Sequence, residues 1–194
     1  MRIVLASKSG VRKEILKKNE IDCDVEPSNV DEDEVKAAML NENATPTLIS
    51  KNLAELKANK VSNKYPDRIV LGADSVIDFE GELISKPKSR QEALEILIKL
   101  NGKKHQLISS VCVSKNGAMI WNYTDVSSLT MKELNLDQIR SYLKKVDDKK
   151  LFAYGVYQIE SGGKDLFLKI DGEEDSIMGL PIKKIKEYFN NLKW

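Results

Sequence analysis

Residues 69–77 have the sequence IVLGADSVI, an apolar and β-branched run that contains one carboxylate, Asp74. Such a run predicts a β-strand over residues 68–79. Gly72 inside it predicts a bulge or a close approach by another part of the chain. Because a carboxylate is costly to bury alone, Asp74 indicates a partner, a metal or a catalytic role; the alternative is a structural carboxylate bonded to backbone amides.

Hairpin signals follow this strand. The Glu-Gly pair at 80–81 predicts a turn into a short strand at 82–85. The Asn-Gly pair at 116–117 joins two long strand-like segments, residues 105–114 and 119–130, and is a strong signal for a two-residue hairpin loop. Hairpins give antiparallel neighbours, whereas strands separated by helices can pair in parallel. The sheet is therefore predicted to be mixed, in a fold of the α/β or mixed α+β class.

The rest of the chain alternates between short strands and helices. Residues 89–92 match the capping-box pattern, which opens a helix expected to end at Asn101-Gly102. A length of 194 residues favours one domain over residues 1–194. The other predicted elements are strands over 2–6 and 22–26, helices through Leu16 and over 31–43, 46–61, 136–146 and 181–192, and a Gly-broken strand and loop over 154–170.

Composition excludes several classes of protein. The 31 Lys and Arg residues balance 30 Asp and Glu residues, so no global field favours nucleic acid or anionic lipid. No run approaches the roughly 20 apolar residues of a membrane span, and the start is too short for a signal peptide, so a cytoplasmic location is expected. Cys23 and Cys112 are far apart and His105 is the single histidine. A bound metal would therefore have oxygen ligands.

Common catalytic motifs are absent from the sequence. It contains no G-x-x-x-x-G-K-[ST], G-x-G-x-x-G, H-E-x-x-H or G-x-S-x-G. This argues against P-loop, Rossmann, zincin and α/β-hydrolase chemistry.

The segment LASKSGVR at residues 5–12 has the composition of an anion-binding turn. Ser7 and Ser9 supply hydroxyls between a strand end and a helix start, and Arg12 supplies a cation. Hydroxyls, free N–H groups at a helix N-terminus and a guanidinium together suit a phosphate. The alternative is an ordinary N-capped helix with a solvated Arg12.

Further charged residues complete a candidate site. Glu32 opens an acidic helix, Lys57 lies on the next predicted helix, and Lys86 precedes Pro87 after a strand. With Asp74 and Arg12 they supply acids for a hard divalent ion, cations for a polyphosphate and a carboxylate able to activate water. The combination suits phosphoryl chemistry.

Seven segments form a pattern along nearly the whole chain. They are LASKSGVR at 5–12, VDE at 30–32, LAELKA at 53–58, GADSV at 72–76, SKP at 85–87, LNGKKH at 100–105 and MGLP at 178–181. In order and spacing, these segments resemble the Maf family of nucleoside triphosphate pyrophosphatases. The resemblance implies an inosine-triphosphatase-like fold with an elongated twisted sheet and a cleft between two lobes. It also implies hydrolysis of a nucleoside triphosphate to the monophosphate and pyrophosphate with Mg²⁺ or Mn²⁺, in a house-cleaning role.

The same resemblance assigns roles to individual residues. Asp74 matches the proton acceptor and a metal ligand, and Glu32 matches a metal-associated acid. Lys57 and Lys86 match the phosphate-binding lysines, and Arg12 matches the second arginine of the family's Ser-Pro-Arg-Arg.

Departures from the family pattern bear on the substrate. Val11 stands where the thymidine- and uridine-selective branch has an arginine, Ser75 replaces its threonine, and Glu160 falls at its glutamine. A carboxylate at Glu160 suits the N1–H and amino group of guanine, so a 7-methyl-GTP-like purine is favoured. The alternatives are dTTP or UTP, if a small register shift brings Gln158 to that place, and a non-catalytic nucleotide-binding regulator.

Other prominent side chains have simpler interpretations. His105 is expected to be a core or hinge hydrogen-bonding group rather than a ligand. Four aromatic residues are expected in the core or at the interface of a homodimer, although one could stack on a base; these are Trp121, Tyr123, Tyr154 and Tyr157.

Overall fold

The computed structural model describes residues 2–192 and contains a seven-stranded mixed sheet with the path β2-β1-β3-β5-β6-β7 and β4 beside β3. The β1–β2 and β1–β3 pairs are parallel, and the other pairs are antiparallel. The predicted mixed α/β class is confirmed. The strands are β1 (Arg2–Leu5), β2 (Asp22–Val25), β3 (Val70–Phe79), β4 (Glu82–Ile84), β5 (Lys104–Lys115), β6 (Ala118–Met131) and β7 (Phe167–Asp171).

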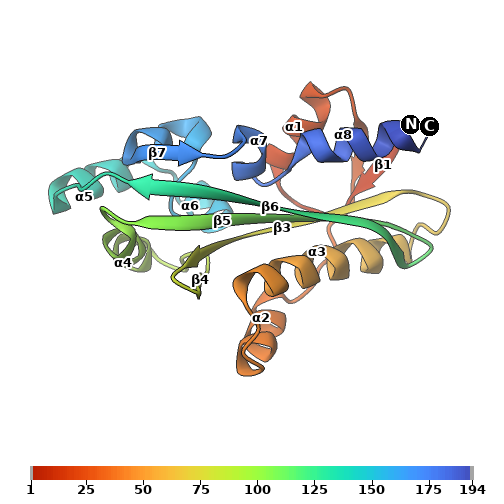
Figure 1. Cartoon of the computed structure of the whole chain (residues 1–194), viewed down its shortest axis with the longest axis horizontal. Coiled ribbons are helices and arrows are strands. Elements are labelled where there is room, and N and C mark those ends of the chain that lie inside the picture. The colour runs from red at the N-terminus through yellow and green to blue at the C-terminus, as the bar shows by residue number, and fades with distance from the viewer. Residues whose placement is uncertain (1, 193–194) are drawn as a thin grey trace.

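Helices cover both faces of this sheet (Figure 1). Helix α3 (Pro46–Ser62) packs along β3 and β5 on one face, and α1 (Gly10–Lys18) and α8 (Ile182–Asn191) pack on the other. Helix α2 (Glu32–Asn41) projects from α3 and buries none of its residues. The remaining helices are α4 (Arg90–Leu100), α5 (Leu136–Lys145), α6 (Asp148–Tyr154) and α7 (Glu174–Ile177), with 3-10 turns at Ile159–Ser161 and Gly163–Leu166. Within the described residues, no helix is both long and apolar enough to cross a membrane.

Both predicted hairpin turns are confirmed. Asn116 and Gly117 have φ of 53° and 76°, and Glu80 and Gly81 have φ of 55° and 86°. Positive φ at both central residues is the signature of the tight turn that matches strand twist.

Gly72 makes the close approach that its place in a strand predicted. A Cβ built on Gly72 would lie 2.3 Å from the Ala54 carbonyl oxygen and 2.7 Å from the Ala58 nitrogen. The pairing of β3 with β5 runs through Gly72 without a register shift, so the bulge alternative is wrong. Helix α3 therefore lies directly against β3 at this point.

One edge of β3 has two strand partners and a gap between them. Strand β1 pairs with Val70 and Leu71, and β4 pairs with residues 77–79. Among the described residues, no strand pairs with 72–76 on this edge. Asp74 and Ser75 therefore lie where the sheet opens.

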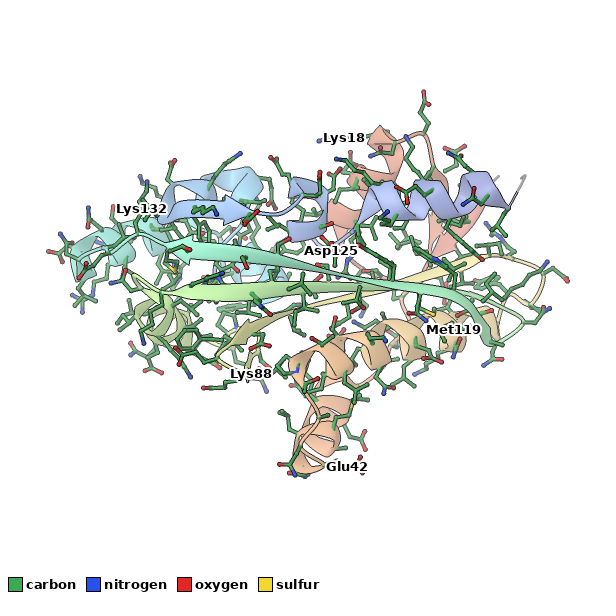
Figure 2. All side chains as sticks on the ribbon, viewed as in Figure 1. Lys18, Glu42, Lys88, Met119, Asp125 and Lys132 are labelled. Carbon is green, nitrogen blue, oxygen red and sulfur yellow. The ribbon has the colours of Figure 1, made fainter. Side chains whose placement is uncertain are left out.

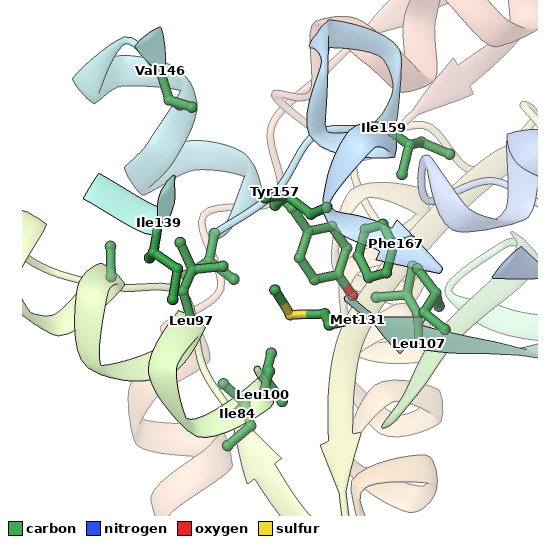
Figure 3. Packing of buried hydrophobic residues seen from close by; sticks show 14 of the residues in the cluster. Ile84, Leu97, Leu100, Leu107, Met131, Ile139, Val146, Tyr157, Ile159 and Phe167 are labelled. Carbon is green, nitrogen blue, oxygen red and sulfur yellow. The ribbon is translucent and has the colours of Figure 1, made fainter. Parts of the chain in front are cut away.

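The buried apolar residues fall into two large clusters. One joins α1 and α8 to β1, β3 and β5. The other lies between α4, α5, β7 and the segment around Tyr157, whose ring meets Phe167 edge-on at 4.9 Å (Figure 3). The two cores flank the opening in the sheet.

Some local predictions are wrong. Ser89 Oγ accepts from the Glu92 N–H as expected, but the Glu92 carboxylate accepts from the Lys88 N–H at 2.7 Å instead of closing the box on Ser89. Residues 154–170 hold the end of α6, two 3-10 turns and most of β7, and α6 and α7 were not expected. These helices have seven and four residues, too short for periodicity to reveal them.

Candidate active site

A cavity of about 400 Å³ opens at the gap in the sheet. The lining comes from the β1–α1 and β2–α2 connections, α1, α2, α3, β3, β4, the β4–α4 connection, β5 and the segments 152–160 and 177–179. The structure brings together all the site residues predicted from the sequence, which are Ser7, Ser9, Arg12, Glu32, Lys57, Asp74, Ser75, Lys86 and Glu160. Their individual roles stay predictions.

Asp74 belongs to a buried ionic cluster centred on Lys57. Lys57 Nζ lies 2.7 Å from Asp74 Oδ1 and 2.8 Å from Glu32 Oε1. Lys57 and Asp74 are 5% and 4% exposed. Asp74 Oδ2 is buried and has no hydrogen-bond partner within the described residues. The alternative of a carboxylate bonded to backbone amides is therefore not what the structure shows, because the Asp74 side chain bonds to an ammonium group.

Secondary structure explains how these three groups meet. Alternation along β3 puts Gly72 and Asp74 on the face covered by α3. The side chain missing at Gly72 lets α3 approach, and Lys57 lies on the buried side of that helix. Glu32 is the first residue of α2, after the N-cap Asp31.

The charges around Glu32 favour its ionised form. Burial opposes ionisation, but Lys57, Lys86 and Lys36 together hold the pKa of Glu32 below its ordinary value of 4.5. At neutral pH this site therefore presents a carboxylate that is ready to bind a cation.

Arg12 connects four parts of the cavity wall. Its Nε donates to the Gly179 carbonyl at 2.9 Å, Nη1 donates to Ser7 Oγ and to the Ala73 carbonyl, and Nη2 donates to Ser75 Oγ at 3.1 Å. A guanidinium has five N–H donors, so these four bonds leave one for a ligand. The bond to Ala73 occupies the open edge of β3. Burial lowers the pKa of Arg12, and Asp74 and Glu32 oppose that shift.

The hydroxyls of the first turn retain their donor hydrogens. Ser7 Oγ accepts from Ser9 N–H and Arg12, and Ser9 Oγ accepts from Arg12 N–H as the N-cap of α1. A hydroxyl that accepts still carries an O–H. Both groups can donate to an anion at this helix N-terminus, where first-turn N–H groups lack intrahelical partners.

Ser75 belongs to a relay of hydroxyls. Ser109 Oγ donates to the Ser176 carbonyl at 2.7 Å, so in its 3.0 Å contact with Ser75 Oγ the hydrogen comes from Ser75. Because Ser75 also accepts from Arg12, its hydroxyl is largely committed to the protein. Ser75 lines the cavity, and its hydroxyl also positions Arg12.

Lys86 contributes a cation to the cavity lining. It has no hydrogen-bond or ion-pair partner in the part of the chain that the structure describes. Desolvation by the cavity walls lowers the pKa of Lys86, aided by Arg12 and Lys57 and opposed by Glu32 and Asp74. Its lack of a protein partner leaves this ammonium available for a ligand.

The wall formed by residues 152–160 carries the two candidates for base recognition. Glu160 is exposed and Gln158 is buried, and both line the cavity. Gln158 Nε2 donates to the Gly155 carbonyl at 2.9 Å. The neighbouring residue, Tyr157, forms a 2.9 Å hydrogen bond between its hydroxyl and His105 Nε2. His105 is thus a buried core hydrogen-bonding residue, as predicted.

Sequence reasoning missed two residues of the site. Lys36 lies one helical turn after Glu32 and also lines the cavity, and its i,i+4 spacing was the available signal. Ser109 is found only through the β3–β5 register, which pairs it with Ser75; nothing in the sequence reveals that register.

The carboxylates present suit a divalent cation only in part. Among the described residues, no group of three or more His, Cys, Asp or Glu side chains could hold a metal. Mg²⁺ commonly binds one or two carboxylates, with substrate phosphates and water completing its shell. Glu32 and the unpartnered Asp74 Oδ2 fit that pattern.

Known proteins resemble this chain along nearly its full length. A nucleoside triphosphate pyrophosphatase of Pelagibacter ubique is 66% identical over 191 residues, 98% of each chain. A 7-methyl-GTP pyrophosphatase of Brucella abortus is 37% identical over 94% of this chain and 92% of its own. The solved Ham1 protein of Staphylococcus aureus covers 84% of this chain and 90% of its own, with a TM-score of 0.48 and 14% identity. The family model described as Maf-like protein matches residues 2–192, and the chain belongs to the Maf family.

Proposed function

We propose that this chain is a nucleoside triphosphate pyrophosphatase, which releases pyrophosphate and leaves the nucleoside monophosphate. The observation that carries the proposal is Asp74, a buried carboxylate with one unpartnered oxygen in a cavity lined by lysines, an arginine and hydroxyls. The names of the relatives from Pelagibacter ubique and Brucella abortus support the same reaction class.

Asp74 is the proposed proton acceptor. Its Oδ1 is held by Lys57, which leaves Oδ2 to accept a proton from water. The water oxygen attacks the α-phosphorus in line, the bond from that phosphorus to the bridging oxygen breaks, and pyrophosphate leaves. The water proton passes to the Asp74 carboxylate.

Lys57, Lys86 and Arg12 supply the charge that a triphosphate needs. Lys86 has no protein partner within the described residues, and Arg12 has one N–H to spare. Negative charge grows on the departing pyrophosphate, and fixed cations around the cavity stabilise it.

We also propose that Glu32 and Asp74 hold Mg²⁺ or Mn²⁺ together with phosphate oxygens of the substrate. Such an ion, when bound, screens phosphate charge and polarises the phosphoryl group. Lys57 keeps both carboxylates beside the cavity before any ligand arrives.

For the substrate we propose a 7-methyl-GTP-like purine nucleotide. Glu160 is an exposed carboxylate on the cavity wall and can accept from the N1–H and amino group of guanine. The name of the Brucella abortus relative agrees with that preference. The competing candidate is dTTP or UTP, favoured by Gln158, which lines the same wall and can both donate to and accept from a pyrimidine.

The test is pyrophosphate release with Mg²⁺ or Mn²⁺ across 7-methyl-GTP, GTP, dTTP and UTP. Asp74→Asn should retain the fold and lower turnover by about 10²–10⁴-fold, because an amide cannot accept the proton. Asp171→Asn, an exposed aspartate on β7, is the matched control and should match the wild type. Near-normal turnover of Asp74→Asn would remove Asp74 from the reaction.

Two further outcomes are informative. Saturable nucleotide binding with no pyrophosphate would favour a non-catalytic regulator. Turnover of dTTP or UTP far above 7-methyl-GTP would overturn the purine preference and point to Gln158.

A further inference from the structure

The four aromatic residues that could have stacked on a base have different surroundings. Trp121 stacks on Tyr188 at 4.6 Å between ring centres and on Tyr123 at 6.3 Å. Tyr157 is buried, with its hydroxyl on His105. Tyr154 alone of the four both lines the cavity and is exposed, at 38%.

Tyr154 reaches from one wall of the cavity to the start of α1. It is the last residue of α6, yet its hydroxyl lies 3.6 Å from where a Cβ on Gly10 would be, at the first residue of α1. The side chain thus extends from the 152–160 wall to the helix N-terminus beside Ser9. Phe152 also lines the cavity, but residues two apart on a helix point in different directions, and no atom of Phe152 lies within 4 Å of a Cβ built on Gly10.

Charge is distributed unevenly around the cavity. All its cations come from elsewhere in the chain, namely Lys8, Arg12, Lys36, Lys57 and Lys86, whereas residues 152–159 (FAYGVYQI) contribute no charged side chain. A triphosphate is drawn to the cationic side. The uncharged end of the same ligand then falls at the wall that carries Tyr154.

We propose that Tyr154 stacks on the base of the bound nucleotide. The inference rests on the proposed function in taking the ligand to be a nucleoside triphosphate. An aromatic ring offers a face to any base, so Tyr154 supplies affinity shared by purines and pyrimidines. Choice between bases is left to hydrogen-bonding groups such as Gln158 and Glu160. This separates the residue that holds the base from those that select it.

The test measures dissociation constants by calorimetry, without turnover, for GTP, 7-methyl-GTP, UTP and inorganic tripolyphosphate. Tyr154→Ala should raise the dissociation constant of each nucleotide by about tenfold or more, which is the scale of one base–aromatic contact. The dissociation constant of tripolyphosphate should stay unchanged. Tyr154→Phe keeps the ring and should bind all four ligands like the wild type. Leu168→Ala, at an exposed β7 residue outside the cavity lining, controls for loss of exposed apolar surface.

Each other outcome contradicts the proposal. Equal weakening in Tyr154→Phe and Tyr154→Ala would assign the contact to the hydroxyl. If Tyr154→Ala weakens the binding of tripolyphosphate as much as that of the nucleotides, the effect of the substitution comes from phosphate binding or from a disturbed cavity. If the wild type binds tripolyphosphate as tightly as the nucleotides, the base contributes nothing to affinity. Failure of the pyrophosphatase proposal appears separately, as absence of pyrophosphate release by the wild type.

Discussion

Lys57 pairs with two carboxylates through one ammonium group. Asp74 Oδ1 and Glu32 Oε1 both lie within 2.8 Å of Lys57 Nζ, and Lys57 and Asp74 are almost wholly buried. Two carboxylates near one another repel, and the ammonium group between them offsets that repulsion. The cluster therefore depends on Lys57 more than on either acid.

This asymmetry predicts how substitutions affect stability. Lys57→Met should lower the free energy of unfolding by about 3–5 kcal/mol, because it leaves a buried carboxylate without its cation. Asp74→Asn should lower it less, since Lys57 keeps its pair with Glu32. Urea unfolding at pH 7 measures both variants. A larger loss for Asp74→Asn than for Lys57→Met would show that the carboxylates do not need Lys57.

His105 predicts a pH dependence of stability that is independent of the site's carboxylates. Burial lowers the pKa of His105 from 6.5 to about 4. Between these values the unfolded chain binds a proton that the folded chain does not, so stability falls as the pH falls through this window. The loss attributable to His105 should be about 2 kcal/mol between pH 7 and pH 5.

The measurement compares the free energy of unfolding of wild type and His105→Gln at both pH values. Glutamine can still bond to Tyr157 but does not titrate, so the variant should lose less stability than the wild type on acidification. Equal losses in the two proteins would contradict a neutral buried imidazole.

At the scale of elements, the contact between β3 and α3 sets the position of Lys57. Gly72→Ala should destabilise the protein by about 3 kcal/mol, because the new methyl group would meet backbone atoms of α3 that cannot move separately. Gly10→Ala is the matched control: its Cβ would meet only Tyr154 Oη at an ordinary 3.6 Å, and stability should be unchanged or slightly higher. Thermal unfolding measures both, and a neutral Gly72→Ala would contradict the close contact.

Most elements could be predicted from local patterns, and the failures have physical causes. The Asn-Gly turn at 116–117 and the alternating segments beside it carry their own conformational signal, so the hairpin was predictable. Helices α6 and α7 are too short to show a period. The Glu92 carboxylate accepts from the N–H of Lys88, one residue before the N–H of Ser89 that the capping box requires. Residue types alone do not encode this difference in local geometry.

At the scale of the whole molecule, the candidate site could be predicted as a set of residues but not as a set of contacts. Asp74 was conspicuous because a carboxylate is unusual in an apolar strand, and the family resemblance supplied its companions. That Lys57 bridges Asp74 and Glu32, or that Ser109 orients Ser75, depends on tertiary packing and strand register. The single-domain and homodimer expectations stay predictions.

Helix α2 is attached to the rest of the molecule mainly at one end. Lys57 bonds to Glu32 and Lys88 bonds to Asp33, whereas Glu42, which caps its other end, lies far from the sheet (Figure 2). With no buried side chain, α2 adds little to the stability of the core. Its outward positions are accordingly open to sequence drift, or to a tag or fluorescent label, without disturbing the sheet. The residues it presents to the cavity, Glu32 and Lys36, are the ones that constrain it closely.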